Sequence, residues 1–177
     1  PGAVQILSYI GYSDNSATGE YVHTKQAIST YFTNFVETAT TVSDPTTLAS
    51  QLVGKHVFLI PEQESASPTI LSSLGTSWAT TLTNFVNNGG MVIVCSWANS
   101  ENLILTNAGL ITAFKGSSPV STSVTKPATT ILNAGVSTPF TGSYIQGFTS
   151  SNGVVSLLDV NSSEAVVLHR DVGLGLS

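Results

Sequence analysis

The sequence predicts an α/β fold: a three-layer sandwich around a doubly wound, mainly parallel sheet, with a β-rich C-terminal third. Two observations carry this prediction. Short apolar runs alternate with helical patterns through the first two thirds of the chain, as in a parallel sheet with crossover helices. After residue 114, short β-prone runs separated by turn pairs such as Asn152-Gly153 replace the helical patterns.

The first two thirds are expected to hold four strands and four helices. Asp44 and Pro45 form a helix-start pair, an N-cap followed by proline in the first turn. Gly89-Gly90 ends a helix, and the all-apolar run after it suits a central parallel strand. The strands are expected at Val4–Tyr9, 37–42, 55–60 and Met91–Val94, and the helices at 21–36, 44–52, 77–88 and Asn102–Asn107.

The last third is expected to extend the parallel sheet with antiparallel strands. Residues 115–130 are rich in Ser, Thr and Pro and are interpreted as a linker or an O-glycosylated loop. The strands are expected at 143–148, 154–158 and Ala165–His169. Residues 1–177 are expected to form a single domain that is excised from, or truncated relative to, a larger protein, because the chain begins at Pro1.

The chain carries few charges: 15 of its 177 residues are charged, against about a quarter in an ordinary soluble domain. Five cationic residues and a net charge of −5 exclude a nucleic-acid binder, and 41% hydrophobic residues argue against disorder. Ser and Thr together number 48, which favours an extracellular or cell-surface location. Asn161 begins a glycosylation sequon, and Cys95 is the single cysteine, so no intrachain disulfide can form.

A ligand-binding crevice is expected beyond the carboxyl ends of the parallel strands, where open α/β sheets bind ligands. No metal or cofactor is expected, because the three histidines are scattered and no glycine-rich phosphate loop follows the first strand. The candidate crevice residues are acidic, aromatic or hydroxyl-bearing: Tyr12, Asp14, Glu62, Glu64, Ser96 and Trp97.

Three segments resemble the class I glutamine amidotransferase-like superfamily, which has a flavodoxin-like α/β fold. They are FVNNGGMVIV at 85–94, VFLIPEQE at 57–64 and AGL at 108–110. The late run VVLHRDVGLG at 166–175 resembles the end of the non-catalytic members that occur as modules of secreted proteins. This resemblance implies a non-catalytic structural or binding module of a secreted or surface protein. Its expected partners are other domains of the same polypeptide, copies of itself or carbohydrate, with no nucleic acid and no membrane insertion.

An enzyme is the first alternative. Active members of the superfamily carry a nucleophilic cysteine after the corresponding strand, and Cys95 occupies that place. The resemblance then implies a hydrolase or amidotransferase with His169 as base and Asp171 orienting it. The chain departs from the active pattern, since Ser96 and the bulky Trp97 follow the cysteine where small residues are usual.

An FMN protein is the second alternative. The loop Ser16-Ala17-Thr18-Gly19-Glu20 resembles the phosphate loop of flavodoxins, and Tyr12 or Trp97 could stack on a flavin ring. The loop does not follow the first strand directly, and Tyr21 replaces its last threonine.

Overall fold

The computed structural model describes residues 2–97, 100–130, 132–173 and 175–176. The chain divides into two compact units, residues 1–110 with 171–177, and residues 111–170. The first is α/β and the second is built from antiparallel strands. The predicted α/β class and the β-rich C-terminal third are therefore confirmed.

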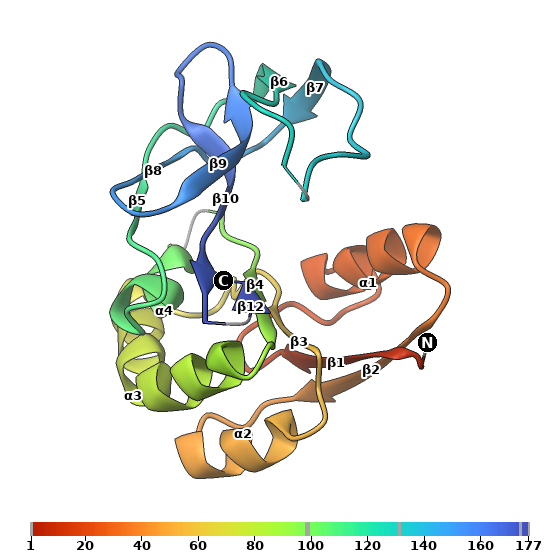
Figure 1. The fold of residues 1–177 in the computed structure, drawn as a ribbon, viewed down its shortest axis with the longest axis vertical. Helices are drawn as coiled ribbons and strands as arrows, with labels where there is room; N and C mark the ends of the chain where they lie inside the picture. The colour runs from red at the N-terminus through yellow and green to blue at the C-terminus, as the bar shows by residue number, and fades with distance from the viewer. Residues whose placement is uncertain (1, 98–99, 131, 174, 177) are drawn as a thin grey trace. The chain divides into compact units, whose positions relative to one another are not determined.

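The first unit is built on a parallel four-stranded sheet in the order β2-β1-β3-β4. Figure 1 shows α1 on one face of this sheet and α2 and α3 on the other. The elements are β1 (Val4–Tyr9), α1 (Glu20–Tyr31), β2 (Phe35–Thr40), α2 (Pro45–Leu52), β3 (Val57–Ile60), α3 (Pro68–Asn87), β4 (Met91–Val94) and α4 (Asn102–Asn107), with the short pair β11 (Asp171–Val172) and β12 (Gly175–Leu176).

Trp78 is the centre of the core between α3 and the sheet. Its side chain is fully buried, and its ring lies edge-on to Tyr9, with the centroids 4.8 Å apart. Phe58 makes a second edge contact at 5.9 Å. The indole N–H donates to the carbonyl of Ser43 at 2.8 Å, so the residue also fixes the segment that leads into α2.

Two helix boundaries predicted from the sequence are wrong. The helix expected at 21–36 ends at Tyr31, and β2 begins at Phe35 rather than at residue 37. The helix expected at 77–88 begins at Pro68, where Ser67 is its N-cap and accepts from the amide of Ile70. Gly75 does not break this helix: it lies against α4, where an added Cβ would come within 2.5 Å of the Ile104 carbonyl oxygen.

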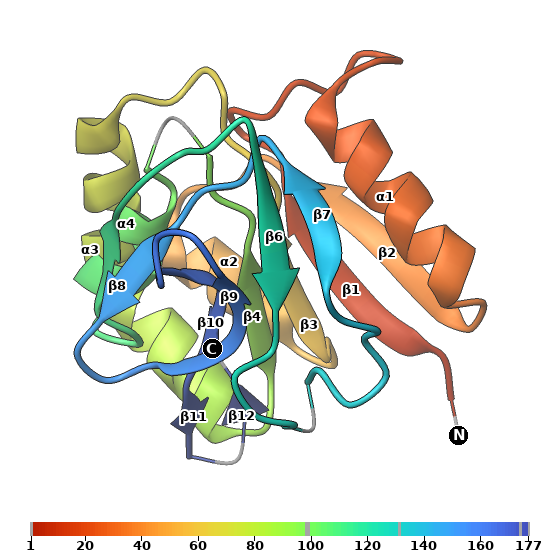
Figure 2. The same cartoon turned by 90° about the horizontal axis from the view of Figure 1, so that it is seen from above.

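The second unit is an antiparallel six-stranded sheet in the order β5-β8-β10-β9-β6-β7. Figure 2 shows β6 and β7 side by side, as their pairing requires. Its strands are β5 (Ala113–Lys115), β6 (Ser121–Thr125), β7 (Phe140–Ser143), β8 (Phe148–Ser150), β9 (Val154–Asp159) and β10 (Ala165–His169).

Three expectations for this unit are corrected. The antiparallel strands form a sheet of their own instead of extending the parallel sheet. The segment 115–130, interpreted as a linker, contains β6. The strand expected at 143–148 is interrupted: Ser143 ends β7, Phe148 begins β8, and residues 144–147 connect them. Tyr144 in this connection has a left-handed φ of 52°, which an extended strand does not allow.

Candidate functional site

Gln63 joins the loops at the carboxyl ends of β1 and β3. Its side chain is fully buried, and its Oε1 accepts from the amide of Tyr12 at 3.1 Å. Its Nε2 lies 3.1 Å from the carbonyl oxygen of Tyr9, 2.7 Å from that of Pro61 and 2.7 Å from the hydroxyl of Ser13. The rim of the predicted crevice is therefore fixed by one amide side chain.

Glu101 ties the loop after β4 into the same network. Its carboxylate is fully buried, and one of its oxygens accepts from the main-chain amide of Gln63 at 3.1 Å. The hydroxyl of Ser96 and the amide of Trp97 donate to its other oxygen, each at 3.0 Å. Ser96 also accepts from the amide of Asn102 at 3.3 Å, so this predicted crevice residue helps to begin α4.

Cys95 follows β4 and continues its hydrogen bonding, since its amide donates to the carbonyl of Ile60 at 2.9 Å. The residue as a whole is only partly exposed. Burial raises the pKa of the thiol to about 11, with further contributions from the negative charges of Glu101 and Glu62. At neutral pH the protonated thiol therefore predominates over the thiolate, which is the form that acts as a nucleophile.

Glu62 is a half-buried carboxyl group among other acids. Burial raises its pKa to about 7, and the charges of Glu101, Glu64 and Glu20 raise it further. Its main-chain carbonyl accepts from the hydroxyl of Ser13 at 2.6 Å, which fixes the backbone beside this group. The loop after β3 therefore contains a carboxyl group whose pKa lies near neutrality.

The raised pKa of Glu62 predicts that the folded protein loses stability as the pH rises from about 4.5 to about 7. In this range the folded state holds a proton that the unfolded state releases, so the unfolded state gains from each increase in pH. We expect the urea concentration at the unfolding midpoint to decrease as the pH is raised from about 4.5 to about 7. This decrease should be smaller in Glu62→Gln than in the wild type. Glu64→Gln should shrink it less, because it removes only one of the neighbouring charges. An undiminished decrease in Glu62→Gln would contradict this assignment.

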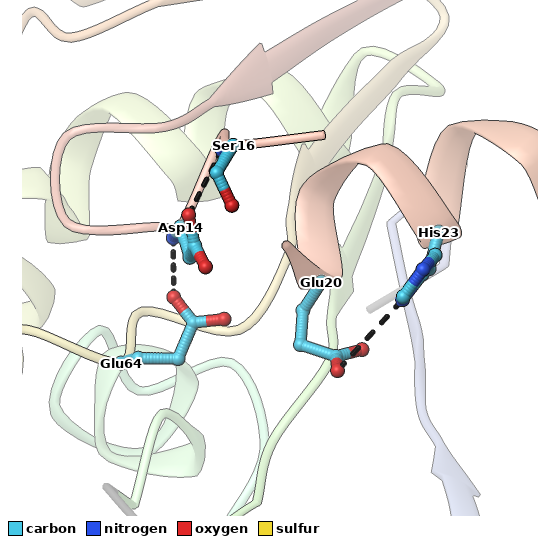
Figure 3. A network of polar contacts seen from close by, with 5 residues as sticks. All are labelled: Asp14, Ser16, Glu20, His23 and Glu64. Carbon is cyan, nitrogen blue, oxygen red and sulfur yellow. Dashed lines mark hydrogen bonds and ion pairs between the residues drawn. The ribbon is translucent and has the colours of Figure 1, made fainter. Parts of the chain in front are cut away.

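The loop from Asp14 to Glu20 lies beside Glu64 (Figure 3). The amide of Asp14 donates to the Glu64 carboxylate, and the amide of Ser16 donates to the Asp14 carboxylate at 2.8 Å. The Ser16 hydrogen bonds lower the pKa of Asp14. The amides of Asp14 and Ser16 are therefore already bound to carboxylates and are not free to bind a phosphate. The negative charges of these two carboxylates would also repel a phosphate. This geometry disfavours the FMN alternative, which stays a prediction.

The other candidate residues come later in the chain: Asn161 and His169 belong to the second unit, and Asp171 belongs to the first. His169 is buried, and its Nδ1 lies 2.7 Å from the hydroxyl of Ser156 within the antiparallel sheet. Asp171 begins β11 and is exposed. Asn161 lies in an exposed turn, where its Nδ2 donates to the hydroxyl of Thr122 at 2.8 Å. The catalytic set of Cys95, His169 and Asp171 and the glycosylation of Asn161 therefore stay predictions.

Sequence reasoning missed Gln63 and Glu101, which organise the crevice loops. Gln63 stands between two predicted crevice acids, Glu62 and Glu64. A glutamine at this position could be either buried and hydrogen-bonded or exposed to solvent, and the sequence does not distinguish the two. Glu101 is one of only ten acids and precedes the apolar run of α4, so its position at a helix start was the available signal. Their partners lie up to 54 residues away, which a local pattern does not reveal.

Two features are absent from the described residues. No group of three or more His, Cys, Asp or Glu side chains in them is placed to hold a metal ion. No helix among them has both the length and the apolar character that crossing a lipid bilayer requires.

The chain is similar in fold to a ThuA-like protein of Bacteroides uniformis, known from a crystal structure. The TM-score is 0.54 at 13% sequence identity, and the likeness covers 89% of this chain and 68% of the other. No protein-family model matches the sequence, and neither does any curated protein. ThuA-like proteins have the class I glutamine amidotransferase-like fold, so the likeness agrees with the resemblance found in the sequence, at the level of fold alone.

Proposed function

We propose that this chain is a non-catalytic binding module of a secreted or cell-surface protein, from the non-catalytic branch of the amidotransferase-like superfamily, with a flavodoxin-like arrangement of its parallel sheet. Its proposed partners are neighbouring domains of the same polypeptide, further copies of the chain, or carbohydrate. The low charge of the sequence supports this role, because a surface rich in Ser and Thr presents little like-charge repulsion to a neutral partner or to a second copy.

The observation that carries the proposal is the buried Glu101 carboxylate beside Cys95. A cysteine nucleophile requires a stabilised thiolate and donors aimed at the developing oxyanion. Here burial and then the neighbouring carboxylates raise the pKa of the thiol, and the amide of Trp97 already donates to Glu101. Both features oppose acyl transfer at this cysteine, which supports a role in binding rather than in catalysis.

The dependence of Cys95 alkylation on pH tests the proposal. We expect iodoacetamide to react slowly near neutral pH, with a rate that rises towards a pKa of about 11. The same protein unfolded in urea supplies the reactivity of an ordinary thiol as reference. Glu62→Gln should lower the pKa of Cys95, because it removes one of the charges that raise it.

His169→Gln separates the proposal from the enzyme alternative. In a binding module, this change leaves the alkylation profile of Cys95 unaltered. In a cysteine hydrolase, the wild-type protein reacts rapidly near neutral pH and His169→Gln abolishes that reactivity. The second result would overturn the proposal.

A further inference from the structure

A pocket of about 350 Å³ lies on the first unit, between the segments that follow β1 and β2 and the helix α3. Three segments line it: the loop after β1, the segment between β2 and α2, and the first half of α3. The volume falls at the lower end of the range of small-molecule sites. The position also fits the general rule for ligand sites in parallel sheets.

The lining of this pocket is neutral and rich in hydroxyl groups. Ile70 and Leu74 supply its apolar part, and Tyr12 adds an aromatic ring. No residue that lines it carries a formal charge at neutral pH. The hydroxyl-bearing residues are Tyr12, Ser43, Thr69, Ser73 and Ser77.

Most of these hydroxyl groups have no partner within the part of the chain that the structure describes. Ser73 donates to the carbonyl of Thr69 at 2.9 Å, in its own helix. The hydroxyls of Tyr12, Ser43, Thr69 and Ser77 make no hydrogen bond to any described residue. Of the neighbouring hydroxyls outside the pocket, those of Ser13, Ser65, Ser67, Thr76 and Thr81 are hydrogen-bonded, whereas those of Ser72 and Thr80 make no hydrogen bond to the described residues.

The backbone around these hydroxyls is fixed before any ligand arrives. The amide of Tyr12 is bound to Gln63, and its carbonyl accepts from the amide of Ser65 at 3.1 Å. The carbonyl of Ser43 accepts from the Trp78 indole, whose side chain is fully buried. The walls of the pocket are thus anchored to the core, which reduces the entropy cost of binding.

We propose that this pocket binds a neutral sugar unit. A sugar ring offers hydroxyl groups that both donate and accept, which matches the side-chain hydroxyls, and an apolar face that suits the Tyr12 ring and the aliphatic side chains. A charged ligand would find no counter-charge in the lining. This inference rests on the proposed binding role and names its ligand class, but it does not involve Cys95.

Titration of the ¹⁵N-labelled protein with cellobiose, maltose and lactose tests the inference by amide chemical shifts. We expect at least one disaccharide to shift the amides of residues 12, 43 and 69–77, with a Kd of about 1 mM, because the pocket is small and its contacts are few. Tyr12→Phe, Thr69→Val and Ser77→Ala each remove one hydroxyl from a side chain that is at least partly exposed. Each should weaken binding by about 3- to 10-fold.

Thr80→Val is the matched control, since Thr80 is an exposed residue of the same helix and does not line the pocket. It should bind the disaccharide as the wild type does. The inference is overturned if no disaccharide at about 20 mM shifts these amides. It is also overturned if the shifts lie elsewhere, or if the pocket variants bind as tightly as Thr80→Val does. These results are independent of the Cys95 alkylation profile, so failure of the sugar site and failure of the non-catalytic role can be told apart.

Discussion

Replacing Glu101 with alanine is expected to lower the free energy of unfolding by about 3 kcal/mol. The carboxylate is fully buried, and its removal leaves the amides of Gln63 and Trp97 and the hydroxyl of Ser96 without their acceptor. Each unpaired buried donor costs about 1 kcal/mol or more. Urea unfolding followed by far-ultraviolet circular dichroism measures the loss.

Glu101→Gln is the matched variant for this prediction. It keeps the shape of the side chain and one acceptor oxygen. Its side-chain NH₂ group replaces the second oxygen and must face a group that is itself a hydrogen-bond donor. We expect a loss between those of the wild type and Glu101→Ala. If Glu101→Ala unfolds at the same urea concentration as the wild type, Glu101 does not hold these loops together.

Replacing Trp78 with alanine is expected to cost about 3 to 5 kcal/mol of stability, which is the range for removing a large buried aromatic side chain. The change empties the space against Tyr9 and Phe58 and leaves the carbonyl of Ser43 without its donor. The same urea experiment measures this loss by circular dichroism, because removing a tryptophan also changes the fluorescence.

Trp78→Phe separates the packing of the ring from the hydrogen bond. It keeps an aromatic side chain against Tyr9 and loses the indole N–H, so we expect a smaller cost of about 1 to 2 kcal/mol. Equal losses in the two variants would mean that the hydrogen bond to Ser43, rather than the packing, carries the stabilisation.

Much of the secondary structure could be predicted from local pattern. Met91–Val94 and Val4–Tyr9 are apolar runs flanked by polar or glycine-rich segments, and both are strands with the predicted bounds. Asp44 caps α2 through its side chain, as its type and the proline after it indicate. These features depend on neighbouring residues, so the sequence alone contains them.

Features that depend on tertiary packing could not be predicted in this way. The helix α3 begins at Pro68, before the predicted start at residue 77, and Gly75 within it allows the close approach of α4 because it has no side chain. Tyr31, Phe32 and Phe35 continue the helical pattern of α1, yet Phe35 begins β2, because it pairs with Val4 of β1.

The candidate site shows the same division. The loops at the strand ends could be located from the strand pattern, and Tyr12, Glu62 and Glu64 lie there. The hydrogen bonds between these loops could not be predicted from the sequence, because they form only in the folded protein. They include those of Gln63 with Tyr12 and of Glu101 with Trp97. The pKa of Cys95 is raised first by burial and then by the charges of Glu101 and Glu62, and these causes depend on how the folded chain packs around the thiol.

The pKa of the Cys95 thiol tests the central claim, a non-catalytic module, most directly. Cys95 is the single cysteine, so cysteine labelled with ¹³C at the β carbon gives one resonance whose shift reports thiolate formation. We expect this resonance to remain that of a protonated thiol at neutral pH and to titrate with a pKa of about 11. A thiolate already formed at neutral pH would contradict the non-catalytic role and favour a cysteine enzyme.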